Sequence, residues 1–127
     1  MGNPVVHFEI TGTDPEGLRR YYGELFGWQF DTSGPVSPAI SEPGNYGFIE
    51  NTAGDGTGIP GGVGGGPGFA GHVIFYVGVP DVEEALRKAE SLGGTRRLGP
   101  ARNPGTSLVI GHFTDPEGHL IGLAGTA

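Results

Sequence analysis

Apolar residues along the chain alternate or recur at helical spacing, in an order that is repeated once. Residues 5–10 alternate as a half-buried strand does, and Pro15 then marks the first turn of a helix that Thr13 or Asp14 would cap. Apolar side chains recur at helical spacing up to Gly27, a residue type that commonly follows a helix. Further strands are predicted at 28–31, 46–51 and 59–63.

The second half predicts the same order of elements. Residues 71–77 form the first strand, and Asp81 and Glu84 have the spacing of a capping box at the start of a helix that ends at Gly93. Residues 115–118 have the composition of a type I turn. The remaining strands are predicted at 95–98, 106–113 and 119–123.

The chain therefore consists of two βαβββ repeats, residues 1–63 and 71–127, joined by a glycine-rich linker at 64–70. Composition predicts that the linker is flexible, and the proline-rich segment 33–44 is typical of a mobile loop beside a pocket. Each repeat is too small to bury its sheet alone, so we expect one compact domain overall. A single open sheet of eight strands is the structural alternative.

Composition and charge restrict the classes of partner. The 27 glycines and 11 prolines suit a β-rich fold with many turns, and the absence of cysteine excludes disulfides and thiolate ligands. The net charge of −7, without a basic cluster, makes nucleic acid a poor partner. No apolar run approaches the roughly 18 residues of a membrane span. We expect a soluble, cytoplasmic protein with no membrane partner.

The repeat, a histidine in the first strand of each half (His7 and His72), and the closing segment Asp115-Pro116-Glu117-Gly118-His119-Leu120-Ile121-Gly122-Leu123 resemble the vicinal oxygen chelate superfamily. This superfamily holds glyoxalase I, bleomycin-resistance proteins, fosfomycin-resistance enzymes and extradiol dioxygenases. The resemblance covers essentially the whole chain. It implies an α+β fold in which the two βαβββ repeats form a cup-shaped half-barrel, and it implies a homodimer. It leaves the function open, because one fold hosts many chemistries.

The resemblance also implies a metal site, with one ligand from the first and one from the last strand of each repeat. His7 and His72 take the first-strand places, but the two last-strand places are Gly62 and Gly122. Without carboxylates the metal site is incomplete, and we expect no cofactor. Strand alternation places Glu9 on the face of His7, so a divalent metal held by His7, His72 and Glu9 is the alternative.

A small organic ligand in the cup is the expectation that remains. A turn with Pro116 and Glu117 at its tip pairs Phe113 with Leu120 and points His112 away from the cup, whereas a bulged turn would reverse that face. Gly62 and Gly122 are expected to enlarge the floor of the cavity. The side chains expected to line it are His7, Glu9, His72, Ile74, Tyr76, Phe113 and Leu120.

Three functions are compatible with these residues. The first is a metal-free protein of the drug-sequestering type, whose acidity suits a cationic guest. The second is a lyase, isomerase or dioxygenase of the glyoxalase type, with an altered metal site or with Glu9 as the general base. The third is an accessory subunit with a vestigial cavity. We take the first as the prediction.

Overall fold

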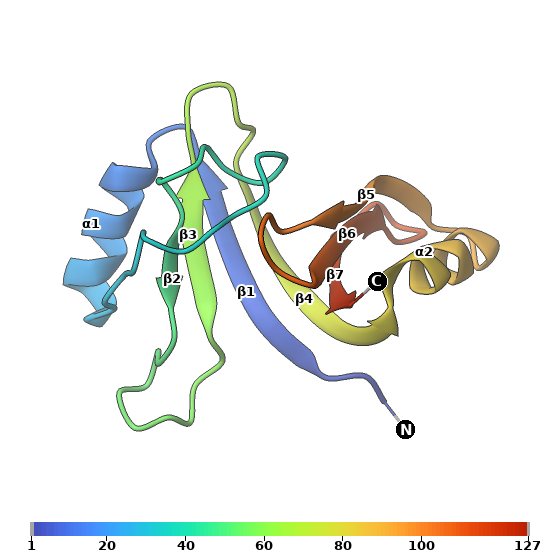
Figure 1. Ribbon diagram of the computed structural model, residues 1–127, viewed down its shortest axis with the longest axis horizontal. Helices are drawn as coiled ribbons and strands as arrows, with labels where there is room; N and C mark the ends of the chain where they lie inside the picture. The colour runs from blue at the N-terminus through green and yellow to red at the C-terminus, as the bar shows by residue number, and fades with distance from the viewer. Residues whose placement is uncertain (1, 127) are drawn as a thin grey trace. The chain divides into compact units, whose positions relative to one another are not determined.

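The computed structural model describes residues 2–126 of the chain, and this part folds into two helices and seven strands, which confirms the α+β class. It divides into two compact units. The N-terminal unit comprises residues 7–73, and the C-terminal unit comprises 2–6 and 74–126. The elements labelled in Figure 1 are β1 (Val5–Gly12), α1 (Pro15–Phe26), β2 (Gly47–Ile49), β3 (Gly61–Gly65), β4 (His72–Asp81), α2 (Val82–Ser91), β5 (Thr95–Arg102), β6 (Leu108–Thr114) and β7 (Leu120–Thr126).

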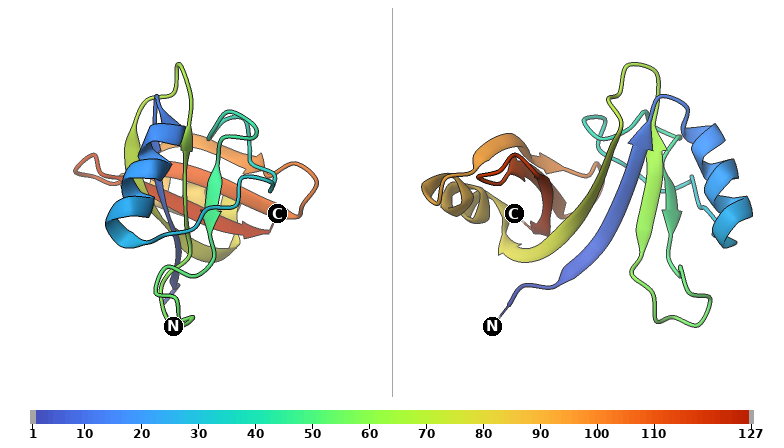
Figure 2. Two further views of the ribbon diagram at one scale, coloured as in Figure 1. Left: turned by 90° about the vertical axis from the view of Figure 1, so that its left-hand side faces the viewer. Right: turned by 180° about the vertical axis from the view of Figure 1, so that it is seen from behind.

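Helix α1 begins and ends where the sequence predicts. The Asp14 side chain accepts a hydrogen bond from the Gly17 backbone N–H at 3.1 Å, which satisfies one unpaired donor of the first turn. Gly27 ends the helix in the left-handed conformation, with φ of 74°. The helix runs alongside β2 and β3, as Figure 2 shows from two sides, and it contacts β3.

The prediction of a strand at 28–31 is wrong. Only Asp31 pairs with a strand: it exchanges two backbone hydrogen bonds with Phe48, of 3.0 and 2.9 Å. The Trp28 ring instead packs against Phe26, with ring centroids 4.9 Å apart, and against Phe8 of β1 at 5.3 Å. Because Trp28 is held against the helix end, the chain does not extend along β2, and this unit is βαββ rather than βαβββ.

Strand β3 reaches into the segment that composition marks as a flexible linker. Its sequence is Gly-Gly-Val-Gly-Gly and all five residues are buried. It pairs in parallel with β1 and antiparallel with β2. Rings lie directly on its backbone, since a β-carbon at Gly61 would come within 2.2 Å of the Phe8 ring. The glycines of β3 therefore make room for aromatic rings, and Gly64 and Gly65 belong to a strand.

The segment 33–44 is anchored to the end of β3. Ser41 is fully buried, and its hydroxyl accepts a hydrogen bond from the Gly65 backbone N–H at 3.0 Å. The Glu42 backbone N–H donates to the Gly65 carbonyl at 2.8 Å, and Ile40 is 5% exposed. These contacts fix the middle of a segment whose composition suggests mobility.

The C-terminal unit has the predicted βαβββ order. Its strands are hydrogen-bonded in the order β4-β7-β6-β5, with β4 and β7 parallel and the other pairs antiparallel. Asp81 caps α2 by accepting from the Glu84 backbone N–H at 3.1 Å. The core on the α2 side consists of Val82, Leu86, Val109 and Leu123.

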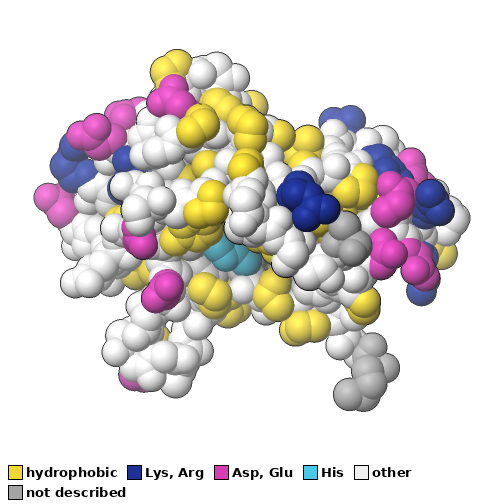
Figure 3. All heavy atoms as spheres, in the orientation of Figure 1, with side chains coloured by type: hydrophobic (Ala, Val, Ile, Leu, Met, Phe, Trp, Pro, Cys, Tyr) yellow, Lys and Arg dark blue, Asp and Glu magenta, His cyan; other side chains and the backbone are white. Residues whose placement is uncertain are grey.

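Charged side chains of both signs intermingle over α2 (Figure 3). Arg96 of β5 forms ion pairs with Glu83 at 2.8 Å and with Glu90 at 3.2 Å, and Arg87 also contacts Glu83 at 2.8 Å. Hydrogen bonds from Arg96, with its charge, lower the pKa of Glu83 to about 2. Neither helix in the described part of the chain has the length and apolar character needed to cross a membrane.

Candidate functional site

Four polar side chains of the N-terminal unit form a hydrogen-bonded chain. The Tyr46 hydroxyl lies 2.9 Å from His7 Nε2 and 3.0 Å from Glu9 Oε1, and His72 Nε2 lies 2.7 Å from Glu9 Oε2. His7 and Glu9 come from alternate positions of β1, Tyr46 directly precedes β2, and His72 begins β4. The structure thus brings together His7, Glu9 and His72, and adds Tyr46, which sequence analysis did not single out.

The direction of these hydrogen bonds follows from the groups present. An ionised Glu9 carboxylate only accepts, so the Tyr46 hydroxyl and His72 Nε2–H both donate to it. The single phenolic proton is then committed to Glu9, and His7 Nε2–H donates to the Tyr46 oxygen. Burial lowers the pKa of His7, and the negative charge of Glu9 opposes that shift in part. The hydrogen bond to Tyr46 requires a proton on His7 Nε2, which fixes the tautomer of a neutral ring.

Glu9 is the most deeply placed charge of the cluster. The residue is 2% exposed, while the His72 side chain is 21% exposed. A buried carboxylate is stable only where hydrogen bonds or opposite charge replace its hydration. Tyr46 and His72 supply two such hydrogen bonds, one to each oxygen.

Gly62 does not open a cavity, and that expectation was wrong. A β-carbon at position 62 would lie 2.1 Å from ring atoms and from the hydroxyl oxygen of Tyr46. Gly62 pairs with Glu9 in the β1–β3 ladder and with Phe48 in the β2–β3 ladder. The space that glycine leaves at the carboxylate position is filled by a tyrosine ring.

The C-terminal unit contains a comparable arrangement around Gly122. The Tyr76 ring lies over this glycine, and a β-carbon at position 122 would come within 2.5 Å of it. The Tyr76 hydroxyl lies 2.8 Å from His112 Nε2, and both residues are buried, at 3% and 6% exposure. His112 therefore lies on the face of Tyr76 and Gly122, whereas the sequence predicted that it points away.

The register of the β6–β7 hairpin explains this difference. His112 pairs with Gly122, Phe113 with Ile121, and Thr114 with Leu120, which is one position away from the predicted pairing of Phe113 with Leu120. The turn is closed by a hydrogen bond of 2.9 Å from the Asp115 N–H to the His119 carbonyl. A slip of one residue in pairing moves every side chain to the other face.

The remaining residues expected to line the cavity lie on different faces of the strands of the C-terminal unit, either on the α2 side or on the side of Gly122. Phe113 packs with the apolar cluster on the α2 side, so it does not share the face of Gly122. Ile74 is buried at 3% exposure on the same face of β4 as Tyr76, and Leu120 alternates with Gly122 on one face of β7.

His7 and His72 lie at different distances along their strands from the residues that pair with Gly62 and Gly122. In the β1–β3 ladder Glu9 pairs with Gly62, and in the β4–β7 ladder Tyr76 pairs with Gly122. His7 lies two positions before Glu9, whereas His72 lies four positions before Tyr76.

Among residues 2–126, no group of three or more His, Asp or Glu side chains is arranged to hold a metal ion. The His7 and Glu9 atoms lie 2.9 and 3.0 Å from the Tyr46 oxygen, which are hydrogen-bond lengths. The donor set that the resemblance implies does not fit the residues present, because Gly62 and Gly122, the positions that it assigns to carboxylate ligands, are covered by tyrosine rings.

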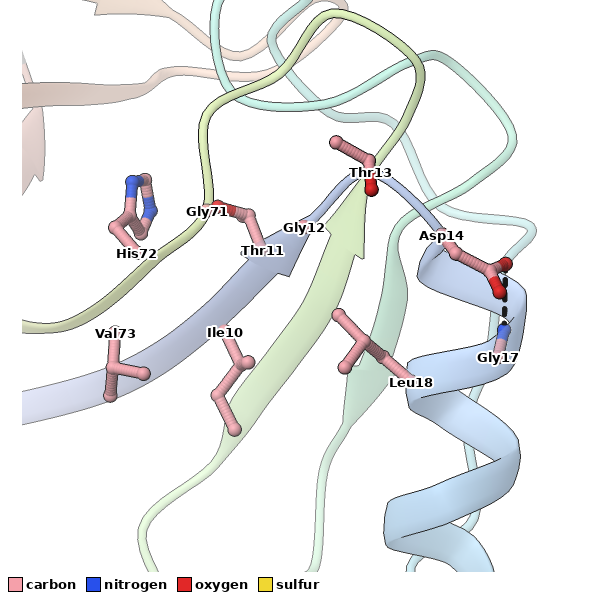
Figure 4. A pocket seen from close by; sticks show the side chains of 10 residues that line it. All are labelled: Ile10, Thr11, Gly12, Thr13, Asp14, Gly17, Leu18, Gly71, His72 and Val73. Carbon is pink, nitrogen blue, oxygen red and sulfur yellow. Dashed lines mark hydrogen bonds between the residues drawn. The ribbon is translucent and has the colours of Figure 1, made fainter.

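An open pocket of about 640 Å³ lies in the N-terminal unit where β1 ends and α1 begins (Figure 4). Its apolar lining comes from Ile10, Leu18 and Val73, and the His72 ring points to the opposite side of the strands from Ile10 and Val73. Of the four residues of the polar cluster, His72 lines this pocket, and His7, Glu9 and Tyr46 do not.

Comparison with known sequences supports the family that the fold suggests. The pattern of the Glyoxalase/Bleomycin resistance protein/Dioxygenase superfamily matches residues 5–123. The chain belongs to this superfamily. No curated protein matches it by sequence.

Solved structures show the same fold in proteins with different names. A Streptomyces coelicolor methylmalonyl-CoA epimerase in complex with 2-nitronate-propionyl-CoA is 16% identical with a TM-score of 0.65, over 98% of each chain. The Mycobacterium tuberculosis methylmalonyl-CoA epimerase is 16% identical with a TM-score of 0.63, over 97% of this chain and 87% of that one. A Legionella pneumophila protein described as an NAD-dependent benzaldehyde dehydrogenase is 16% identical with a TM-score of 0.60, over 95% and 98%. At this identity the likeness is one of fold alone.

Proposed function

We propose that this superfamily member binds a small organic molecule without a metal ion, through the polar cluster of His7, Glu9, Tyr46 and His72. The observation that carries the proposal is the position of the Tyr46 ring over Gly62. The ring fills the space where the resemblance implies a carboxylate ligand, and its hydroxyl lies between His7 and Glu9. A ligand at this cluster meets hydrogen-bonding groups and one carboxylate.

The cost of the cluster supports a binding role. Four polar side chains, one of them a carboxylate at 2% exposure, stabilise a small fold less than well-packed apolar residues would. Departures from an apolar interior are expected at functional sites. The carboxylate and the net charge of −7 favour a cationic or neutral guest over an anionic one.

A second function is favoured by the contact of 2.7 Å between Glu9 and His72. A carboxylate that orients an imidazole is a common arrangement for moving a proton, and removal of a proton beside a carbonyl requires such a base. The structural neighbours include methylmalonyl-CoA epimerases, whose reaction inverts one carbon centre. In this version His72, whose side chain is 21% exposed, takes the proton from the substrate, and the Glu9 carboxylate, which accepts from His72 Nε2–H, orients the ring and stabilises the imidazolium that forms.

The first experiment measures the melting temperature of chelator-treated protein with and without Ni²⁺, Zn²⁺ and Mn²⁺, and with bleomycin and methylmalonyl-CoA as organic probes. Binding to the folded state alone raises the melting temperature, by an amount set by ligand concentration over Kd. We expect a shift from an organic probe that Glu9→Gln abolishes, and none from the metals. A metal shift that is lost in His7→Ala would refute the proposal.

Deuterium exchange separates binding from catalysis. If the chain transfers protons, solvent deuterium enters methylmalonyl-CoA in the presence of the protein, and Glu9→Gln stops this exchange. Binding without exchange supports the metal-free binding protein. The homodimer and the cytoplasmic location stay predictions, and sedimentation equilibrium tests the first of them.

A further inference from the structure

Resting on the proposed function, we infer that Tyr46 and Gly62 form a matched pair in which the tyrosine hydroxyl replaces a metal ion as the link between His7 and Glu9. Part of this arrangement recurs in the C-terminal unit, where the Tyr76 ring covers Gly122 and its hydroxyl meets His112. The inference concerns how the site works: hydrogen bonds to phenols stand where a Lewis acid would otherwise act.

A side chain at position 62 would point at the Tyr46 hydroxyl. A β-carbon at position 62 would lie 2.1 Å from the Tyr46 hydroxyl oxygen. That oxygen is within 3.0 Å of both His7 Nε2 and Glu9 Oε1. Any side chain at position 62 therefore grows toward the point that the imidazole and the carboxylate share, and Tyr46 occupies that point.

The phenol of Tyr46 can form hydrogen bonds with both neighbours at the same time. A hydroxyl donates one hydrogen bond and accepts up to two, so Tyr46 serves a carboxylate acceptor and an imidazole donor at once. Metal ions hold such ligands at about 2.0–2.2 Å, much closer than the lengths seen here. The phenol links the same two groups without adding positive charge.

The C-terminal unit contains a related packing of a tyrosine over a glycine. Its tyrosine, Tyr76, lies on β4, whereas Tyr46 precedes β2, so the two residues do not correspond in the repeat. Yet each ring covers the glycine of the last strand of its unit, and each hydroxyl meets a histidine Nε2, at 2.9 Å for His7 and 2.8 Å for His112. Two different residues reaching one local arrangement point to a shared requirement.

The inference narrows the class of ligand. A ligand with two adjacent oxygens is suited to chelation of a metal ion. Residues 2–126 contain no group of three or more His, Asp or Glu side chains that could hold such an ion. Single polar groups that donate to Glu9 or exchange hydrogen bonds with His72 suit it better. We therefore expect amines, alcohols and amides of small organic molecules to bind in preference to α-hydroxy ketones or catechols.

Four proteins test the pair: wild type, Gly62→Glu, Tyr46→Ala and the double variant. Gly62→Glu should lower the melting temperature steeply, because its side chain meets the Tyr46 ring, and Tyr46→Ala in the same chain should restore much of the loss. Calorimetric titration of the chelator-treated proteins with Zn²⁺ and Ni²⁺ is the second measurement. We expect one site per chain in the double variant, lost on adding His7→Ala, and none in the other three.

Controls keep the outcomes distinct. Gly2→Glu adds a carboxylate where no atom lies within 4 Å, so it should change neither melting nor metal binding. If Gly62→Glu does not fold, Gly62→Ala replaces it in the melting cycle. Additive melting effects at positions 46 and 62, or a double variant that gains no metal, would overturn the inference while leaving the proposed function intact. Metal binding by wild type through His7 would refute the proposed function itself.

Discussion

The Tyr76 ring lies so close over Gly122 that a β-carbon at position 122 would sit 2.5 Å from ring atom Cδ2. Such a distance is not found in folded proteins, so either the ring or the strand would have to move. The tyrosine is 3% exposed and its hydroxyl is bonded to His112, which leaves the ring little freedom to shift. Glycine at position 122 is therefore a packing requirement of β7.

Gly122→Ala should destabilise the chain although it adds one methyl group. Overpacking of this kind costs about 1–3 kcal/mol. Urea unfolding followed by circular dichroism measures the loss, and Gly2→Ala is the matched control, since nothing lies within 4 Å of that glycine. A Gly122→Ala protein as stable as the control would show that the ring moves freely.

Removal of the Tyr46 hydroxyl tests the hydrogen-bonded chain without disturbing the ring. Tyr46→Phe keeps the cover over Gly62 but removes the donor to Glu9 and the acceptor for His7. Hydrogen bonds to a charged group contribute about 1.5–3 kcal/mol, so we expect a loss of that order in the free energy of unfolding.

Tyr21→Phe is the control for that measurement, because Tyr21 is 60% exposed. Its hydroxyl can exchange protein contacts for water at little cost, and the expected change is within about 0.5 kcal/mol. Equal effects of the two substitutions would mean that the Tyr46 hydroxyl holds nothing in place.

The helices could be predicted from local chemistry alone. Asp14 with Pro15 and Gly27 marks both ends of α1, and Asp81 with Glu84 marks the start of α2. Caps and helical spacing act within a few residues, so neighbouring letters of the sequence carry the signal.

The sequence predicted a strand at 59–63, but the continuation of β3 to Gly65 and the polar cluster could not be predicted in this way. Gly61–Gly65 becomes a strand because Phe8 and Tyr46, far away in sequence, pack their rings on its backbone. Composition describes the glycines but not the rings that cover them. The alternation of β1 did place His7 and Glu9 on one face, whereas Tyr46 directly precedes β2 and no periodicity marks it.

The face of His112 depended on a single position of register. The sequence of the turn, Asp115-Pro116-Glu117-Gly118, fixes its place but leaves open whether Phe113 or Thr114 pairs with Leu120. The turn forms a hydrogen bond of 2.9 Å from the Gly118 N–H to the Asp115 carbonyl, and His119 closes it on the other side. Only the structure shows that His112 faces Gly122.

The ion pair of Glu83 and Arg96 should make stability depend on pH and salt. The pKa of Glu83 is lowered to about 2 in the folded chain. A carboxyl group with a lowered pKa contributes stability above its unfolded pKa, and the contribution disappears as pH falls from about 4.5 to about 2. The melting temperature of Glu83→Gln should therefore lie below that of wild type at neutral pH, and the difference should vanish in strong acid.

Glu84→Gln is the matched control for that pair. Glu84 follows Glu83 on the same turn of α2 and is exposed, so its loss removes an equal charge without breaking the contact to Arg96. High salt should shrink the effect of Glu83→Gln, because exposed ion pairs are screened. A difference that is insensitive to both acid and salt would assign the effect to packing.

His7 should make the folded chain less stable in mild acid. Its pKa is lowered in the fold, chiefly by burial, from an ordinary value of 6.5. Below that pH the unfolded chain takes up a proton that folded His7 does not, so stability falls as pH drops from about 6.5 toward the folded pKa. The slope of unfolding free energy against pH should be flatter in His7→Gln, since glutamine still donates to the Tyr46 oxygen but does not titrate. Nitrogen chemical shifts of the imidazole give the same answer directly, with a His7 midpoint below 6.5. A midpoint above that value, or equal slopes in the two proteins, would show that the charge of Glu9 outweighs burial at His7.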